Sequence, residues 1–333
     1  MHNRQLPVQL PIWPEKVRGG PNPFLRSALF AGVPSRFRKI LETRKSAADE
    51  PEGVMVAAQQ GISIRYTGTQ LNQYDADVFF EVLHRARRSP LGEVARFSGC
   101  NFLRSIGRGT SESEYQDLDT ALRRLKRGLV DVKWTTRSKR LAYTGSLLDD
   151  FERDLNTKEY CVSLSPKIKT LFESSSFTHI EWDERQRLLR NPLAQWLHSY
   201  YSTHAKPFSV SIAFLQQTSG QESARPRDFA QSLRRALNIL QTELGWSVEW
   251  LEGNLVKITR SPSNTQIRHL GRKAARKQSL EIANRPRSAP PVLRSSPMAG
   301  TWLTHLSDSP AHRDQAGEEG LVSVREILSA HFR

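Results

Sequence analysis

Two segments of this 333-residue chain carry arginine, glutamine and asparagine at spacings that suit contact with DNA. Residues 120–127 (TALRRLKR) and residues 231–238 (QSLRRALN) share a leucine followed by two arginines. Wound as helices at about 100° per residue, both gather apolar residues into one stripe and polar residues opposite it. Arginine pairs with phosphates and guanine, and asparagine and glutamine pair with adenine. We therefore predict DNA contacts from Arg123, Arg124, Lys126 and Arg127 on the first helix, and from Arg227, Gln231, Arg234, Arg235 and Asn238 on the second.

A charged helix face is most often only a solvated face, and this alternative applies to either helix alone. The surroundings favour a functional pair, because similar elements accompany both segments. Phe102–Gly107 and Phe214–Gly220 each indicate a short preceding helix that ends at glycine, and the alternating segments Val130–Trp134 and Trp246–Trp250 each indicate a following strand. The repeat predicts two related domains. We expect more base contacts from the second helix, which offers amides, and more phosphate contacts from the first.

The predicted order in both halves is helix, short strand, helix, basic helix and hairpin, which is the order of a winged helix. In the second half, Glu252–Asn254 turns the chain into the strand Leu255–Arg260. We expect Lys257 and Arg260 of this hairpin to contact the DNA backbone. The predicted fold class is α+β, with two tandem winged-helix domains, a flexible N-terminal arm and a basic C-terminal tail.

Changes in composition place the domain boundaries. Residues 1–60 contain a proline-rich opening and a basic segment, which predicts an N-terminal arm. Residues 61–179 and 180–261 hold the two predicted winged-helix domains. Beyond them the apolar periodicity is lost and basic clusters alternate with proline and serine, so residues 262–333 are predicted to be a disordered tail that adds sequence-independent affinity for DNA.

The overall charge agrees with a nucleic-acid partner. The formal net charge is +15 and the sequence pI is about 10.1, which favours binding to a polyanion through counterion release. No apolar run approaches the ~20 residues that span a bilayer, and no secretory leader is visible, so a cytoplasmic protein without membrane contact is expected. The two cysteines, Cys100 and Cys161, lack metal-ligand neighbours and are interpreted as ordinary thiols.

Enzymatic functions find little support in the sequence. A rolling-circle initiator needs a His-x-His metal pair, which none of the nine histidines forms, and Tyr200–Tyr201 lies in an apolar helix. An ATP-driven initiator needs a phosphate-binding loop, which is absent. A spacing of six places His198 and His204 on different helix faces, so both are expected to be structural rather than metal ligands. We expect no enzymatic activity, metal or cofactor.

Several segments together resemble the TrfA family of plasmid replication initiators, and the resemblance covers roughly residues 5 to 260. They are Trp13–Arg18, Arg26–Phe30, Ile64–Gly68, Pro90–Glu93 and Ala194–His204. The resemblance implies tandem winged-helix domains that bind repeated origin sequences, called iterons. It also implies opening of an adjacent AT-rich segment, whose single strands are a further expected ligand, and recruitment of the host replicative helicase and sliding clamp.

Two other functions remain open beside replication initiation. A winged-helix transcriptional regulator would use the same helices without melting an origin, and a rolling-circle nickase would be an enzyme. The sequence also leaves open whether the free protein is a monomer or a self-dimer.

The segment Gln9–Trp13 resembles the sliding-clamp peptide Gln-Leu-x-Leu-Phe of bacterial polymerases and initiators. In such a peptide Leu10, Ile12 and Trp13 would fill a hydrophobic cleft while Gln9 forms a hydrogen bond beside it. The alternative is that Trp13 and the neighbouring prolines pack this segment onto the first domain. The two hypotheses place the same side chains in different surroundings.

Overall fold

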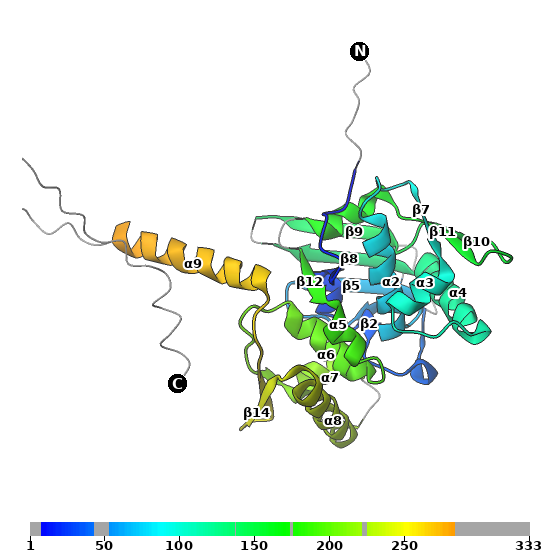
Figure 1. Cartoon of the computed structure of the whole chain (residues 1–333). Coiled ribbons are helices and arrows are strands. Elements are labelled where there is room, and N and C mark those ends of the chain that lie inside the picture. Colours follow the sequence, from blue (N-terminus) through cyan, green and yellow to red (C-terminus); the bar gives the residue numbers. More distant parts are fainter. Residues whose placement is uncertain (1–7, 43–52, 137, 174–175, 222–224, 284–333) are drawn as a thin grey trace, which may run out of the picture. The chain divides into compact units, whose positions relative to one another are not determined.

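The structure is a computed structural model that describes residues 8–42, 53–136, 138–173, 176–221 and 225–283. Helices and strands are mixed along these residues, which confirms the α+β class (Figure 1). The chain up to Leu280 forms one unit by its internal contacts, and only this unit is described below.

The first half contains a three-helix unit with a small antiparallel sheet. Asn72 caps the start of helix α2: its side chain accepts a hydrogen bond from the Tyr74 N–H, while the carboxylate of Asp75 accepts one from the Asn72 N–H. The sheet has the order β10-β11-β7, so the strand after α2 pairs with the second strand of a later hairpin. The elements are α2 (Gln73–Ala86), β7 (Val94–Ser98), α3 (Gly99–Ser105), α4 (Glu112–Arg127), β10 (Asp150–Arg153) and β11 (Glu159–Ser163).

The second half repeats the order of these elements and of their strands, without the two further strands that follow α4 in the first half. Its sheet has the order β14-β15-β13, with both pairings antiparallel. Gly245, in the left-handed region, caps the end of helix α8, and the hairpin turn predicted at Glu252–Asn254 is present, with Asn254 at a φ of 57°. The elements are α6 (Pro192–Ser202), β13 (Val210–Ser211), α7 (Ile212–Thr218), α8 (Pro226–Leu244), β14 (Ser247–Leu251) and β15 (Leu255–Thr259).

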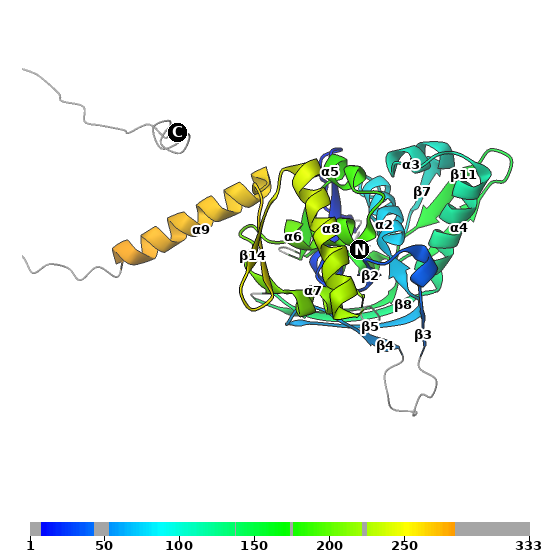
Figure 2. The ribbon, with the colours of Figure 1, turned by 90° about the horizontal axis from the view of Figure 1, so that it is seen from below.

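The strand after α4 differs from its predicted role. Val130–Trp134 lies in β8, which pairs with β5 and β9 in a five-stranded sheet rather than forming the hairpin beside β7 (Figure 2). That hairpin position is taken by β10 and β11, later in the chain. Gly128 connects α4 to β8 where the Tyr66 hydroxyl leaves no room for a Cβ, which would lie 2.3 Å from it. The strands are β3 (Ile40–Leu41), β4 (Val54–Val56), β5 (Ile62–Thr69), β8 (Leu129–Thr135) and β9 (Arg140–Ser146).

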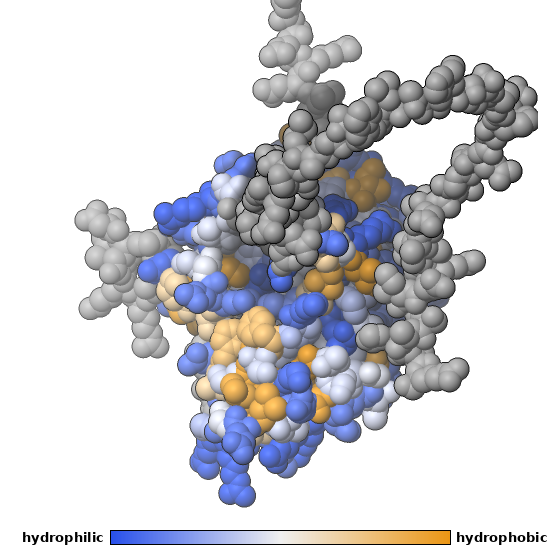
Figure 3. Space-filling view, turned by 90° about the vertical axis from the view of Figure 1, so that its left-hand side faces the viewer, coloured by the Kyte–Doolittle hydropathy of each residue, from blue (hydrophilic) through white to orange (hydrophobic). Residues whose placement is uncertain are grey.

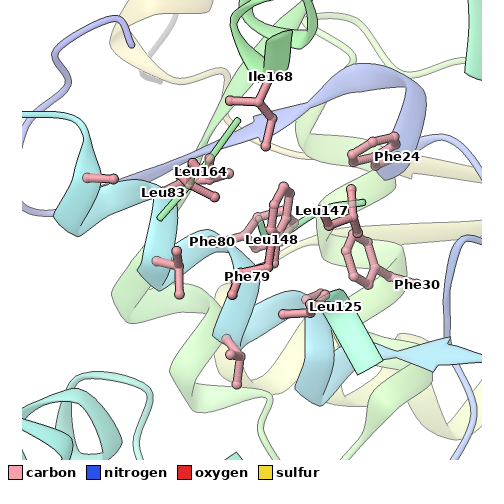
Figure 4. Packing of buried hydrophobic residues seen from close by; sticks show 14 of the residues in the cluster. Phe24, Phe30, Phe79, Phe80, Leu83, Leu125, Leu147, Leu148, Leu164 and Ile168 are labelled. Atoms are coloured by element: carbon pink, nitrogen blue, oxygen red, sulfur yellow. The ribbon is translucent and has the colours of Figure 1, made fainter. Parts of the chain in front are cut away.

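The described part of the predicted N-terminal arm belongs to the folded unit, which corrects the prediction for residues 1–60. Strand β1 pairs with β12, about 160 residues later, and β2 pairs with β6. Figure 4 shows Phe24 and Phe30 beside Phe79 and Phe80 of α2. The centroids of the Phe30 and Phe79 rings are 5.8 Å apart. The elements are β1 (Val17–Pro21), α1 (Asn22–Leu25), β2 (Phe30–Ala31), η1 (Ser35–Phe37), β6 (Leu71–Asn72) and β12 (Phe177–Glu181), where η marks a 3-10 helix.

The buried apolar residues form two clusters, one reaching from Leu10 to Trp182 and one from Leu188 to Ile258. Between them lies α5 (Trp182–Arg187), preceded along the chain by η2 (Pro166–Phe172) and β12. The guanidinium of Arg185, 1% exposed, donates to Asp77 of α2 at 2.5 Å and to the Ser199 hydroxyl of α6 at 2.8 Å. A buried, hydrogen-bonded charge therefore joins the two halves.

The beginning of the predicted disordered tail is helical. Helix α9 covers Asn264–Ala283, and the side chain of Gln266 donates to the Ser202 carbonyl at 2.8 Å. Its basic residues are exposed as far as the structure describes them. The prediction for the remainder of the tail lies outside the described residues. Within the described part, none of the helices is long and apolar enough to cross a membrane.

Candidate nucleic-acid interface

Helix α8 has the two faces that the sequence predicts. Its apolar stripe lies in the second core and consists of Phe229, Leu233, Ala236, Leu237 and Leu240. All five predicted DNA contacts on the opposite face are exposed: Arg227, Gln231, Arg234, Arg235 and Asn238. Pro226 lies in the first turn, and Leu244 ends a helix of 19 residues, which is long enough to lie in a major groove. The arrangement presents cations and amides together on one continuous surface.

Trp250 lies beside this surface and is not among the residues predicted from the sequence. Trp250 on β14 is 42% exposed, and the guanidinium carbon of Arg234 lies 5.3 Å from its ring centroid. Trp250 pairs across the hairpin with Val256, whose side chain is buried, so the indole lies on the side of the sheet that faces the core. The alternation of β14 could have indicated this orientation. The contact orients Arg234 at the junction of α8 and its hairpin.

The two predicted contacts on the second hairpin have different surroundings. Lys257 is exposed and forms an ion pair with Glu249 at 2.8 Å on the neighbouring strand. Arg260 departs from the prediction, because its side chain donates to the carbonyls of Tyr201 and Ser202 at the end of α6. Burial lowers the pKa of the Arg260 guanidinium. Arg260 therefore closes the end of a helix and is not presented for DNA.

Helix α4 offers fewer free cations than the sequence predicts. Arg123, Lys126 and Arg127 are exposed, and Lys126 forms an ion pair with Asp150. The prediction that Arg124 lies on the outer face is wrong, because Arg124 donates to the fully buried carboxylate of Asp75 at 2.7 Å. This pair fixes α4 to the first turn of α2. Of the four cations predicted on α4, Arg123 and Arg127 pair with neither Asp75 nor Asp150.

The first turns of α4 are acidic, and some of these acids hold the neighbouring hairpin. Asp119 accepts hydrogen bonds from Arg153 and from the Tyr160 hydroxyl, both at 2.7 Å. Glu112 lies within ion-pair distance of Arg153 and Lys158. Negative charge in the first half of the helix repels phosphate, so only the second half of α4 suits a DNA backbone.

The predicted clamp-binding peptide is packed against the first half, as the alternative hypothesis expected. Leu10 and Trp13 are 3% and 2% exposed, and Gln9 donates to the carbonyl of Arg87 at 3.1 Å. The Trp13 ring stacks on Phe172, with centroids 5.8 Å apart. Ile12 alone is exposed, at 72%. In this conformation the aromatic anchor is not available to fill a partner's cleft.

His198 and His204, the two histidines considered above as metal ligands, have structural partners. His198 lies 3.0 Å from Glu184 and stacks on Trp246, and burial lowers the pKa of this histidine. His204 lies within hydrogen-bond distance of the Tyr200 carbonyl. Across the described residues, no group of three or more His, Cys, Asp or Glu side chains could hold a metal ion.

Apolar surface is dispersed on the face shown in Figure 3. Where this face is not covered by grey atoms, orange residues form separate patches among blue ones. Large continuous apolar patches mark protein or membrane contacts, whereas mixed surfaces are ordinary solvent-facing ones. The charged face of α8 is therefore a more specific indication of a partner than this surface.

Comparison with known proteins gives one family and one relative of known name. The family model described as TrfA protein matches residues 2–260. The plasmid replication initiator protein TrfA of Escherichia coli is 26% identical over 252 residues, which cover 74% of this chain and 63% of that protein, so the chain spans less than two thirds of its relative's length.

Solved structures of RctB give weaker similarities. A crystal structure of RctB domains 2 and 3 has a TM-score of 0.47 and 13% identity, covering 72% of this chain and 98% of that one. A second RctB structure has a TM-score of 0.42 and 13% identity, covering 68% of this chain and 93% of that one.

The family match spans more than three quarters of the sequence, and the chain belongs to the TrfA family.

Proposed function

We propose that this protein initiates plasmid replication by binding repeated origin DNA through two winged-helix units. The observation that carries the proposal is the exposed row of Arg227, Gln231, Arg234, Arg235 and Asn238 along α8. Membership of the TrfA family, and the name of the Escherichia coli relative as a plasmid replication initiator, support the same function.

Two features support the winged-helix assignment. Both halves have the order helix, strand, helix, helix and hairpin, with β8 and β9 inserted before the hairpin of the first half, and in both sheets the short strand pairs with the second hairpin strand. In this arrangement the third helix enters the major groove and the hairpin, or wing, lies beside the flanking backbone. We assign α4 and α8 as the groove helices, with β10–β11 and β14–β15 as the wings.

In this proposal α8 reads the DNA sequence and α4 positions the protein on the DNA backbone. Asn238 and Gln231 of α8 contact base edges, and the neighbouring arginines contact guanine or phosphate. Arg123 and Arg127 of α4 contact phosphates, because α4 combines an acidic first half with a basic second half. Sequence preference therefore resides mainly in the second unit and positioning in the first.

Opening of an AT-rich segment and recruitment of the host helicase and sliding clamp belong to the same proposal, supported by the family. Clamp binding through Gln9–Trp13 would require this segment to leave its packed position against α2, because Leu10 and Trp13 are buried. Recruitment through this peptide is therefore coupled to a local unfolding of the N-terminal segment.

The test is a titration of the full chain with two labelled duplexes, one carrying the direct repeats of its plasmid origin and one of shuffled sequence. We expect tighter binding to the repeats at physiological salt. Asn238→Ala should weaken repeat binding by about 1–3 kcal/mol with little effect on the shuffled duplex. Ser63→Ala, on an exposed position of β5, is the matched control and should change neither. Equal affinity of the unmodified protein for both duplexes would overturn the proposal.

A further inference from the structure

A short ridge of two exposed apolar side chains lies next to cations in the segment Arg36–Ile40. Phe37 is 57% exposed and Ile40 is 72% exposed. Arg36 and Lys39 beside them are also exposed, and the guanidinium carbon of Arg36 lies 4.8 Å from the Phe37 ring centroid. Exposed phenylalanine and isoleucine gain nothing from burial here, so their placement points to a partner that covers them.

The backbone between the two apolar residues is held in place by hydrogen bonds. Between the two apolar residues, Arg38 turns inward and donates to Asn72 and to Asp75 at 2.5 and 2.8 Å. The carbonyl of Lys39 accepts from the Gln70 N–H at 2.8 Å. The exposed side chains therefore project from a fixed backbone, which lowers the entropy lost when they bind.

The same carboxylate anchors the ridge and the first groove helix. Asp75 accepts Arg38 on one oxygen and Arg124 of α4 on the other. Figures 1 and 2 both show the blue segment that contains η1 beside α4. The ridge therefore flanks the end of α4 that carries Arg123 and Arg127, and it extends the basic surface with Arg36 and Lys39.

We infer that Phe37 and Ile40 form a wedge that enters the minor groove of origin DNA next to α4 and kinks the duplex. Apolar side chains flanked by arginine or lysine partly unstack a base step in this way, and the cations neutralise the phosphates on either side. AT-rich DNA contains TA steps, which deform most easily. The inference rests on the proposed function. It adds a DNA contact that lies outside the winged-helix elements and bends the DNA.

The test measures affinity and bend angle of the full chain on a repeat-containing duplex that carries a fluorescence-transfer pair at its ends. The double variant Phe37→Ala/Ile40→Ala should lose most of the bend and bind the repeats at least tenfold more weakly. Phe37→Leu keeps an apolar wedge and should retain most of the bend. Arg36→Ala/Lys39→Ala should lower the slope of log affinity against log salt by about two.

Phe208→Ala is the matched control, since Phe208 is 50% exposed and lies in the second half. Its bend and affinity should equal those of the unmodified protein, and all variants should keep its melting temperature. The inference is wrong if the double variant binds and bends the repeats as the unmodified protein does. This holds even if the double variant has lost binding to a protein partner. If the unmodified protein does not prefer the repeats, the proposed function itself fails.

Discussion

The indole Nε1 of Trp13 donates a 3.0 Å hydrogen bond to Nδ1 of His84, 71 residues later in the chain. Because Nδ1 accepts, the ring proton lies on Nε2, which faces a carboxylate oxygen of Glu15 at 2.8 Å. The bond to His84 lowers the pKa of Glu15 to about 2. The N-terminal segment is therefore fixed to α2 by packing and by a specific tautomer of one histidine.

Replacing Trp13 tests whether this segment stabilises the fold. Trp13→Ala should lower the free energy of unfolding by about 3–5 kcal/mol, because it empties a buried aromatic site and removes the partner of His84. Urea denaturation monitored by circular dichroism measures the loss. Ile12→Ala, one residue away and exposed, should change stability by no more than about 0.5 kcal/mol. Unchanged stability in Trp13→Ala would show that the segment is a free arm.

Acid should destabilise the protein through its buried histidines. Burial lowers the pKa of His84 to about 4, and burial also lowers the pKa of His204 to about 4. The unfolded chain takes up these protons near pH 6.5 and the folded one only near pH 4, so stability present above pH 6.5 is lost as the pH falls between these values. Thermal unfolding between pH 7.5 and 5 should show a falling Tm.

Two variants identify the source of this pH dependence. His84→Gln should reduce the fall in Tm between pH 7.5 and 5, whatever its effect at pH 7.5, because one titrating group is removed. His269→Gln, on exposed α9, should leave the fall unchanged. The same pH dependence in both variants would contradict the assignment to buried histidines.

The sequence predicts local features of the fold well. The 3.6-residue period places Phe229, Leu233 and Leu240 in the core and the arginines of α8 outside it. The turn residues Gly253 and Asn254 mark the second hairpin. These predictions hold because helix faces and tight turns depend on residues only a few positions apart.

Partners distant in sequence could not be predicted in the same way. Val130–Trp134 alternates as a strand, but its neighbour β5 lies more than 60 residues earlier, and alternation does not specify a neighbour. Arg124 looks like a DNA contact until Asp75, 49 residues away, is placed beside it. From the sequence alone, Trp13 fits a partner-binding peptide as well as it fits a buried position in the core. In each case a non-local contact decides the role of the side chain.

Arg124 and Arg127 should behave differently although both lie on α4. Arg124→Ala removes one of the two arginines bonded to the buried carboxylate of Asp75, which keeps Arg38, so it should lower stability by about 1.5–3 kcal/mol. Arg127→Ala removes an exposed cation, so it should leave stability unchanged and reduce the salt dependence of DNA binding by about one unit. Urea denaturation and a salt titration separate these effects. If Arg124→Ala keeps its stability but loses affinity for DNA, Arg124 contacts DNA after all.

The buried pair of Arg185 and Asp77 should contribute far more to stability than an exposed pair. Asp77→Ala leaves an uncompensated guanidinium at the junction of the two cores and should cost about 3–5 kcal/mol in urea denaturation. Glu249→Ala breaks the exposed pair with Lys257 and should cost less than about 1 kcal/mol. Similar losses in the two variants would show that the junction is open to water.

Trp250 should act on DNA through Arg234. Its ring holds the guanidinium beside α8, so Arg234 gives up less side-chain freedom when it meets the duplex. Trp250→Ala and Arg234→Ala should each weaken repeat binding, and the double variant should lose less than the sum of the two. We expect a coupling energy of about 0.5–1 kcal/mol from this double-mutant cycle, measured by anisotropy at one salt concentration. Trp250→Phe keeps an aromatic face and should retain most of the affinity. Strict additivity of the two alanine variants would mean that the two side chains contact DNA independently and that their stacking in the free protein has no bearing on recognition.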